Sequence, residues 1–112
     1  MTTQTDQELL ELAAYAAGVK NARWSNGFGG MAGNQDGRPV IFNPLTSDAD
    51  AFRLMSRLAM RITYRSVDVD VSCFAACCSE YVPTYKDAAE ATRRAITRAA
   101  AAIGQSMKEQ GK

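Results

Sequence analysis

The segment FNPLTSDADAFRL at positions 42–54 constrains the fold more than any other part of the chain. Residues 40–42 are β-branched or aromatic, which favours a strand. Asn43 and Pro44 end that strand, because proline lacks an amide donor and disfavours helical geometry in the residue before it. Thr46 or Ser47 then offers a hydroxyl to the first free amides of a helix, and two aspartates bring negative charge to its first turn. The segment predicts a strand that passes into a helix, with these structural residues: Asn43, Pro44, Leu45, Asp48 and Asp50.

The size and charge of the chain narrow its class. Its 112 residues suit one domain spanning 1–112, with frayed ends at 1–4 and 108–112. Thirteen basic against 12 acidic side chains give a net charge of +1, so no overall charge attracts nucleic acid or an anionic membrane. The first residues lack the pattern of a secretory signal, and no apolar stretch is long enough to cross a bilayer. We therefore expect a cytoplasmic protein that does not bind membranes.

The cysteines lie close together, at Cys73, Cys77 and Cys78, and the chain has no histidine. A zinc site would need a fourth ligand, which this segment does not supply. We expect the three thiols to be reduced and buried as small apolar side chains, and we predict no metal and no cofactor.

Two helices are expected in the first half. Thr5 and Glu8 form a capping box ahead of a helix at residues 6–17, which Gly18 ends. The second helix covers about residues 47–60, with Arg53 and Arg57 opposite an apolar face made by Ala51, Leu54, Met55 and Leu58.

A third helix is expected at the end of the chain, from a cap near Thr84 to about Met107. Alanine gives it a high helix propensity and permits close packing. Its apolar stripe comprises Ala88, Thr92, Ala95, Ile96, Ala99, Ala102, Ile103 and Met107. The rest of its surface carries Glu90, Arg93, Arg94, Thr97, Arg98 and Gln105.

Glycines crowd residues 26–37, between a short strand at 22–25 and the strand at 40–42. A phosphate-binding loop would run from a strand into a helix, whereas this segment runs into a strand. We therefore interpret it as a hairpin connection between antiparallel strands, with Asp36 and Gly37 as the turn.

The alternation of apolar and polar residues changes phase between residues 61 and 73. Ile62 and Tyr64 face the core if even positions do, whereas Val67, Val69, Val71 and Cys73 require odd ones, so a bulge or turn is needed near Arg65. A strand at 67–75 would leave Asp68 and Asp70 in solvent, and residues 77–82 are a further candidate strand. The order helix, two strands, helix, two or more strands, helix predicts an α+β fold. We expect an antiparallel sheet of about four strands with three helices packed on it, in three layers if helices cover both faces.

Three segments together carry a resemblance: ELLELAAYAAG at 8–18, the central segment at 42–54, and AEATRRAITRAAAAIG at 89–104. They are similar to the phage ABA sandwich domain, a group of small phage proteins with WNPLTDDGDALRL and ATRRAIVRAAAEIG segments. Phe42 stands where tryptophan is common and Ala49 where glycine is common. The resemblance implies an α-β-α sandwich encoded by a phage or prophage and acting in the host cytoplasm. It implies no reaction.

Catalysis is the first function to consider. Without histidine, the usual general base for a serine or cysteine nucleophile is missing. Carboxylates able to hold magnesium for phosphoryl transfer are Asp48, Asp50, Asp68 and Asp70. A helix dipole and an exposed strand face explain all four without a metal, so we expect a protein that is not an enzyme.

Nucleic-acid binding is the second, through arginines on two helices. The candidates for phosphate contacts are Arg53, Arg57, Arg93, Arg94 and Arg98. Glu90 precedes two of them at pairing distance along the helix, and the nearly neutral chain gains little from counterion release.

Non-catalytic binding of a host protein or a ligand is the preferred hypothesis. Small phage proteins of the kind that the resemblance implies often occupy a host component, such as a defence system. Trp24, Phe28 and Met31 around the glycine-rich loop are candidate exposed anchors, although Trp24 is equally compatible with the core. A homodimer through the alanine stripe of the last helix competes with the need of the sheet for the same stripe.

Overall fold

A computed structural model describes residues 5–65, 67–72, 77–81 and 87–110 of the chain. The described residues form three helices and six strands. In chain order these elements are α1 (Asp6–Ala16), β1 (Val19–Ser25), β2 (Gly30–Gln35), β3 (Arg38–Phe42), α2 (Asp48–Arg57), β4 (Arg61–Tyr64), β5 (Asp68–Ser72), β6 (Cys77–Tyr81) and α3 (Ala88–Gln110).

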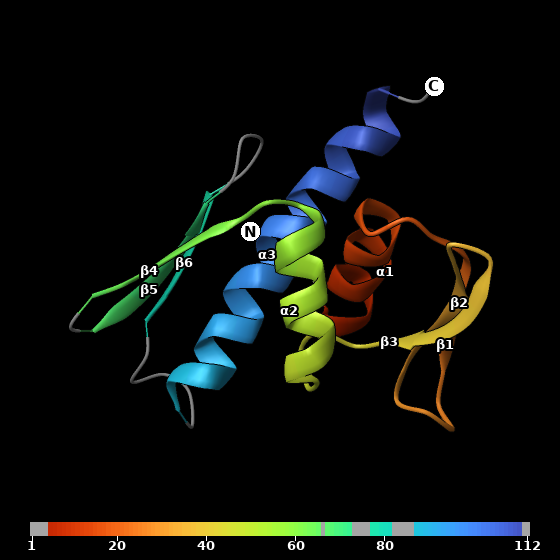
Figure 1. The fold of residues 1–112 in the computed structure, drawn as a ribbon, viewed down its shortest axis with the longest axis horizontal. Helices are drawn as coiled ribbons and strands as arrows, with labels where there is room; N and C mark the ends of the chain where they lie inside the picture. The colour runs from red at the N-terminus through yellow and green to blue at the C-terminus, as the bar shows by residue number, and fades with distance from the viewer. Residues whose placement is uncertain (1–4, 66, 73–76, 82–86, 111–112) are drawn as a thin grey trace.

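The strands form two antiparallel sheets rather than one. The first sheet has the order β1-β2-β3, and the second has the order β4-β5-β6. The helices lie between them: α1 packs on the first sheet and on α3, and α3 packs on the second sheet (Figure 1). The prediction of an α+β fold with antiparallel strands and three helices is confirmed. Two predictions differ from the described structure. We expected a single sheet of about four strands with helices packed on it, whereas the described strands form two three-stranded sheets with the helices between them (Figure 1).

The additional strand of the first sheet is β2, in the glycine-rich stretch. Glycine has a low strand propensity, so the sequence indicated only a connection there. The structure shows why glycine fits: a Cβ on Gly33 would lie 2.8 Å from the carbonyl oxygen of Lys20 in the neighbouring strand. The hairpin turn itself is as predicted, because Asp36 and Gly37 connect β2 to β3 with φ values of 53° and 80°.

The predicted strand-to-helix joint is confirmed. The Ser47 hydroxyl accepts a hydrogen bond from the amide of Asp50, so Ser47 rather than Thr46 is the N-cap of α2. Asp50 Oδ2 in turn accepts from the amide of Asn43 at 2.9 Å, and Asn43 Oδ1 accepts from the amide of Leu45 at 3.1 Å. Together with the fully buried Pro44, these bonds close the turn between β3 and α2.

The boundaries of the other helices follow local chemistry. In α1 the capping box is present: Glu8 accepts from the Thr5 amide at 2.9 Å, and Thr5 accepts from the Glu8 amide at 3.1 Å. The end of α2 comes earlier than the predicted residue 60. Asp87 caps the start of α3 by accepting from the amide of Glu90, while Thr84 lies outside the described residues. Residues 108–110 continue α3, which therefore ends later than the predicted Met107.

The buried face of α3 is wider than the predicted stripe. Ala88, Ala102 and Met107 are exposed and Ile103 is half-buried, contrary to prediction, whereas the rest of the stripe is buried. Additional buried residues are Ala91, Thr97, Ala100, Ala101 and Gly104. The reason is that α1, α2 and the second sheet all contact α3, so burial extends around more than one side.

The second sheet has the predicted turn between its first two strands, where the Arg65 amide donates to the carbonyl of Asp68 at 2.8 Å. Val69 and Val71 are buried as predicted, but Val67 precedes β5 and is 46% exposed. The structure describes β5 as far as Ser72, and Cys73 and the remainder of the predicted strand at 67–75 lie outside the described residues. Cys77 and Cys78 lie in β6, which confirms the candidate strand there. The prediction that their side chains are buried falls outside what the structure describes.

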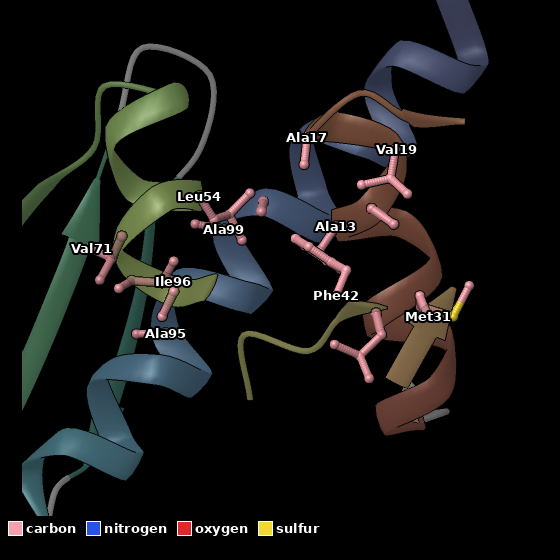
Figure 2. Packing of buried hydrophobic residues seen from close by; sticks show 14 of the residues in the cluster. Ala13, Ala17, Val19, Met31, Phe42, Leu54, Val71, Ala95, Ile96 and Ala99 are labelled. Carbon is pink, nitrogen blue, oxygen red and sulfur yellow. The ribbon is translucent and has the colours of Figure 1, made fainter. Parts of the chain in front are cut away.

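One apolar cluster links the helices to both sheets. Figure 2 shows Phe42 of the first sheet beside Ala13 of α1, with Val19 and Met31 on the same side of the cluster, while Ile96 of α3 lies toward Val71 of the second sheet. Leu54 of α2 joins the same cluster and is 2% exposed. Small alanines at the centre let α1 and α3 approach closely.

Candidate binding surfaces

Of the three predicted anchors around the glycine-rich loop, one side chain is exposed and two are partly or fully buried. Phe28 lies at the tip of the β1-β2 connection and is 72% exposed. Trp24 is partly buried against the core, and its indole Nε1 donates to Asn26 Oδ1 at 2.7 Å. Met31 is 1% exposed, so the prediction that it is an exposed anchor is wrong. Its position in β2, which the glycine pattern concealed, turns it toward the core.

Each of the five predicted phosphate-binding arginines has a carboxylate partner. The pairs are Arg53 with Asp50 at 2.9 Å, Arg57 with Asp36 at 3.3 Å, Arg93 with Asp48 at 2.7 Å, Arg94 with Asp6 at 2.5 Å, and Arg98 with Glu80. The three arginines of α3 therefore reach three different elements or their ends. These contacts direct the guanidinium groups toward the protein itself and do not bring them together as one phosphate-binding cluster.

The four predicted metal-binding carboxylates are also dispersed. Asp48 pairs with Arg93, and Asp50 pairs with Arg53 and accepts from the amide of Asn43. Asp70 pairs with Arg65 at 2.5 Å, whereas the buried Oδ1 of Asp68 has no hydrogen-bond partner among the described residues. The Asp70 side chain is only 16% exposed, so it is less solvent-facing than the strand pattern predicted. Within the described parts of the chain, no group of three or more acidic, cysteine or histidine side chains is arranged to hold a metal ion.

An apolar groove of about 300 Å³ lies between α2, α3 and the edge strand β4. Two aromatic side chains on its lining are largely exposed, Phe52 at 62% and Tyr64 at 60%. The remaining lining residues are Asp48, Ala51, Met55, Ile62, Ala89, Thr92, Arg93 and Ile96. We call this surface the aromatic groove.

Tyr64 is held in position by a hydrogen bond. Its hydroxyl lies 2.9 Å from Thr92 Oγ1, and the Thr92 hydroxyl donates to the carbonyl of Ala88 at 2.7 Å. Because the single Thr92 proton is used in that bond, the Tyr64 hydroxyl is the donor to Thr92. The ring is therefore fixed beside the groove, although the alternation of β4 had predicted it in the core.

A larger cleft of about 600 Å³ lies between α1, the first sheet and the end of α3. Its lining combines apolar and charged side chains: Glu11, Tyr15, Gly18, Val19, Lys20, Asn21, Ala22, Met31, Met107 and Lys108. The Lys108 ammonium lies 5.3 Å from the centroid of the Tyr15 ring, within reach of a cation–π interaction. We call this site the lysine cleft.

No family model, curated protein or solved structure matches this chain. None of the helices that the structure describes is both long and apolar enough to cross a membrane.

Sequence reasoning missed both hollows for a common reason: each combines elements from earlier in the chain with the distant helix α3. One signal was available for the aromatic groove, since Phe52 lies off the apolar face of its helix, where a large aromatic side chain is unusual. No comparable signal marked the lysine cleft, because Met107 and Lys108 were expected to lie in or next to a frayed end.

Proposed function

We propose that this chain is a non-catalytic binding protein that contacts a partner protein through the aromatic groove. The observation that carries the proposal is the exposure of Phe52 and Tyr64 on the lining of an apolar hollow. Aromatic side chains in such positions dominate the energetics of protein interfaces, particularly where a pocket lies beside them.

The chemistry of the groove indicates what the partner presents. Ala51, Met55, Ile62 and Ile96 offer an apolar lining, and methionine adapts to the shape of what it contacts. Asp48 and Arg93 on the same lining already pair with each other. The groove therefore suits an apolar anchor such as a leucine or phenylalanine side chain, rather than a charged group.

The biological setting is proposed from the resemblance to small phage proteins. In that setting the partner is a protein of the host cytoplasm, and a component of a host defence system is the kind of target that such proteins occupy. The α-β-α layering implied by the same resemblance is not needed for this proposal, which depends only on the groove.

Two other functions have less support. Of the carboxylates proposed for phosphoryl transfer, Asp48, Asp50 and Asp70 each pair with an arginine. The arginines proposed for nucleic acid each have an acidic partner. A homodimer through the alanines of α3 is also less supported, because α1 already covers much of that helix.

The proposal is tested by capture of a partner from host lysate with three matched baits: the wild-type chain, Phe52→Ser and Phe28→Ser. Both substitutions remove an exposed phenylalanine, so they alter solubility similarly and differ in location. We expect one stoichiometric host protein with the wild type and with Phe28→Ser, and a dissociation constant for that protein about thirtyfold higher with Phe52→Ser.

The other outcomes are equally informative. Loss of the partner with Phe28→Ser alone would place binding at the glycine-rich loop instead of the groove. Failure to capture any protein, together with heparin retention that fades steeply with salt, would favour nucleic acid and contradict the proposal.

A further inference from the structure

The lysine cleft carries positive charge that the described part of the protein does not neutralise. Neither Lys20 nor Lys108 has a carboxylate within salt-bridge distance among the described residues, whereas six arginines do. The one acidic side chain on the lining, Glu11, accepts a hydrogen bond from Gln7 at 3.3 Å. The cleft therefore offers two ammonium groups to an anion.

The rest of the lining is apolar and adaptable. Tyr15 supplies an aromatic ring that is 42% exposed, Val19 and Met31 come from the first sheet, and Met107 comes from the end of α3. A volume of about 600 Å³ is within the range of small-molecule sites, which typically combine an apolar lining with a few polar groups. The shape and composition fit a molecule with an apolar body and a charged end.

A backbone irregularity borders the cleft. The pairing of β1 with β2 shifts between Lys20 and Arg23, and Asn21 within the shift has a φ of 57°. A positive φ costs free energy for a residue other than glycine, and such bulges are common beside functional sites, where they redirect a side chain. Here the bulge follows the buried Val19 and the exposed Lys20, which both line the cleft.

We propose that the lysine cleft binds a small apolar molecule bearing a single carboxylate, with Lys20 and Lys108 as its charge partners. Glu11 on the lining leaves a net charge of +1 among the three ionised side chains, which suits a monoanion better than a phosphate dianion. The Lys108 ammonium lies against the Tyr15 ring, so an aromatic or aliphatic body can occupy the apolar lining while its carboxylate meets an ammonium group. This site shares no lining residue with the aromatic groove and does not depend on the function proposed for the groove.

The test uses 1-naphthylacetate and its neutral analogue 1-naphthylacetamide as matched probes. Calorimetry measures their dissociation constants, and amide chemical shifts in NMR spectra locate them. The variants are Lys20→Met, Lys108→Met and the double variant, which remove the charge and keep an unbranched side chain one atom shorter. Arg61→Met is the control, because Arg61 is an exposed cation on β4 outside the cleft.

We expect the carboxylate to bind with shifts confined to the cleft, and each lysine variant to weaken its binding by about threefold to fivefold. The double variant should weaken it by about tenfold, to the level of the amide, while Arg61→Met has no effect. Equal affinity for the acid and the amide, unchanged affinity in the lysine variants, shifts outside the cleft, or no binding at millimolar probe would each overturn the proposal.

Discussion

Asp50 holds the joint between sheet and helix with a carboxylate that is only 15% exposed. It accepts from the Asn43 amide and from Arg53, so its loss leaves a sheltered backbone donor without a partner. We expect Asp50→Ala to lower the free energy of unfolding by about 2 kcal/mol, the cost of losing a hydrogen bond to a charged group. Urea unfolding followed by circular dichroism measures it.

The matched control is Asp48→Ala, two residues away on the same helix. The Asp48 side chain is 80% exposed, and its ion pair with Arg93 is open to solvent on that side. Removal of the Asp48 carboxylate should lower the free energy of unfolding by only about 0.5 kcal/mol. Equal costs for the two substitutions would show that charge in the first turn of α2, rather than closure of the joint, sets the stability of this region.

The capping box of α1 predicts a dependence on pH. The backbone amide and then the hydroxyl of Thr5 donate to the Glu8 carboxylate and hold its pKa below its ordinary value. A lowered folded-state pKa means that the ionised group stabilises the fold at pH values above its ordinary pKa. That contribution is lost as the pH falls through the lowered pKa.

We therefore expect the wild type to melt at a higher temperature than Glu8→Gln near neutral pH, and the difference to disappear in acid. Melting curves of both proteins between about pH 7 and about pH 3 test this, because other carboxylates titrate alike in the two chains. A difference that stays constant over this range would mean that Glu8 acts through packing or helix propensity rather than through its charge.

At the level of elements, α1 and α3 pack backbone against backbone at Gly104. A Cβ on this residue would lie 2.0 Å from the carbonyl oxygen of Leu12, which is backbone and has no free rotation. We expect Gly104→Ala to separate the two helices and to lower the free energy of unfolding by about 3 kcal/mol, even though alanine favours a helix.

Gly27→Ala provides the comparison, because a Cβ there meets nothing within 4 Å. It should change stability by less than about 0.5 kcal/mol. Chemical denaturation of the two variants gives both values. A neutral Gly104→Ala would show that the helices are free to move apart without loss of packing.

Local chemistry explains which elements were predictable from the sequence. The capping box, the joint at Asn43 and Pro44, and the turn at Asp36 and Gly37 depend on neighbouring residues, and all three are present as predicted. β2 was missed because its glycines are required by a partner strand and not by their own propensity. The exposed Phe52 and Tyr64 and the lysine cleft depend on how distant elements meet, which periodicity alone does not specify.

At the scale of the whole molecule, the helices occupy the middle and the sheets the two sides (Figure 1). Each sheet therefore has one face on the helices. On the opposite face of the first sheet lie exposed side chains such as Arg23 and Ile41. The apolar residues of the helices serve two sheets at once, which accounts for the broad buried surface of α3.

This layering predicts the order in which backbone amides exchange with solvent. Ala13, Ala99 and Ala100 are 0% exposed and lie where α1 and α3 meet, so their amides should open only in global unfolding. β4 is an edge strand that begins at the exposed Arg61. Its amides should exchange with solvent on the order of a hundredfold faster than those of the three alanines. Hydrogen exchange followed by NMR measures both sets in one experiment. If helices instead covered a central sheet, the sheet amides would be the slowest to exchange, so strands that outlast α1 and α3 would contradict the arrangement described above.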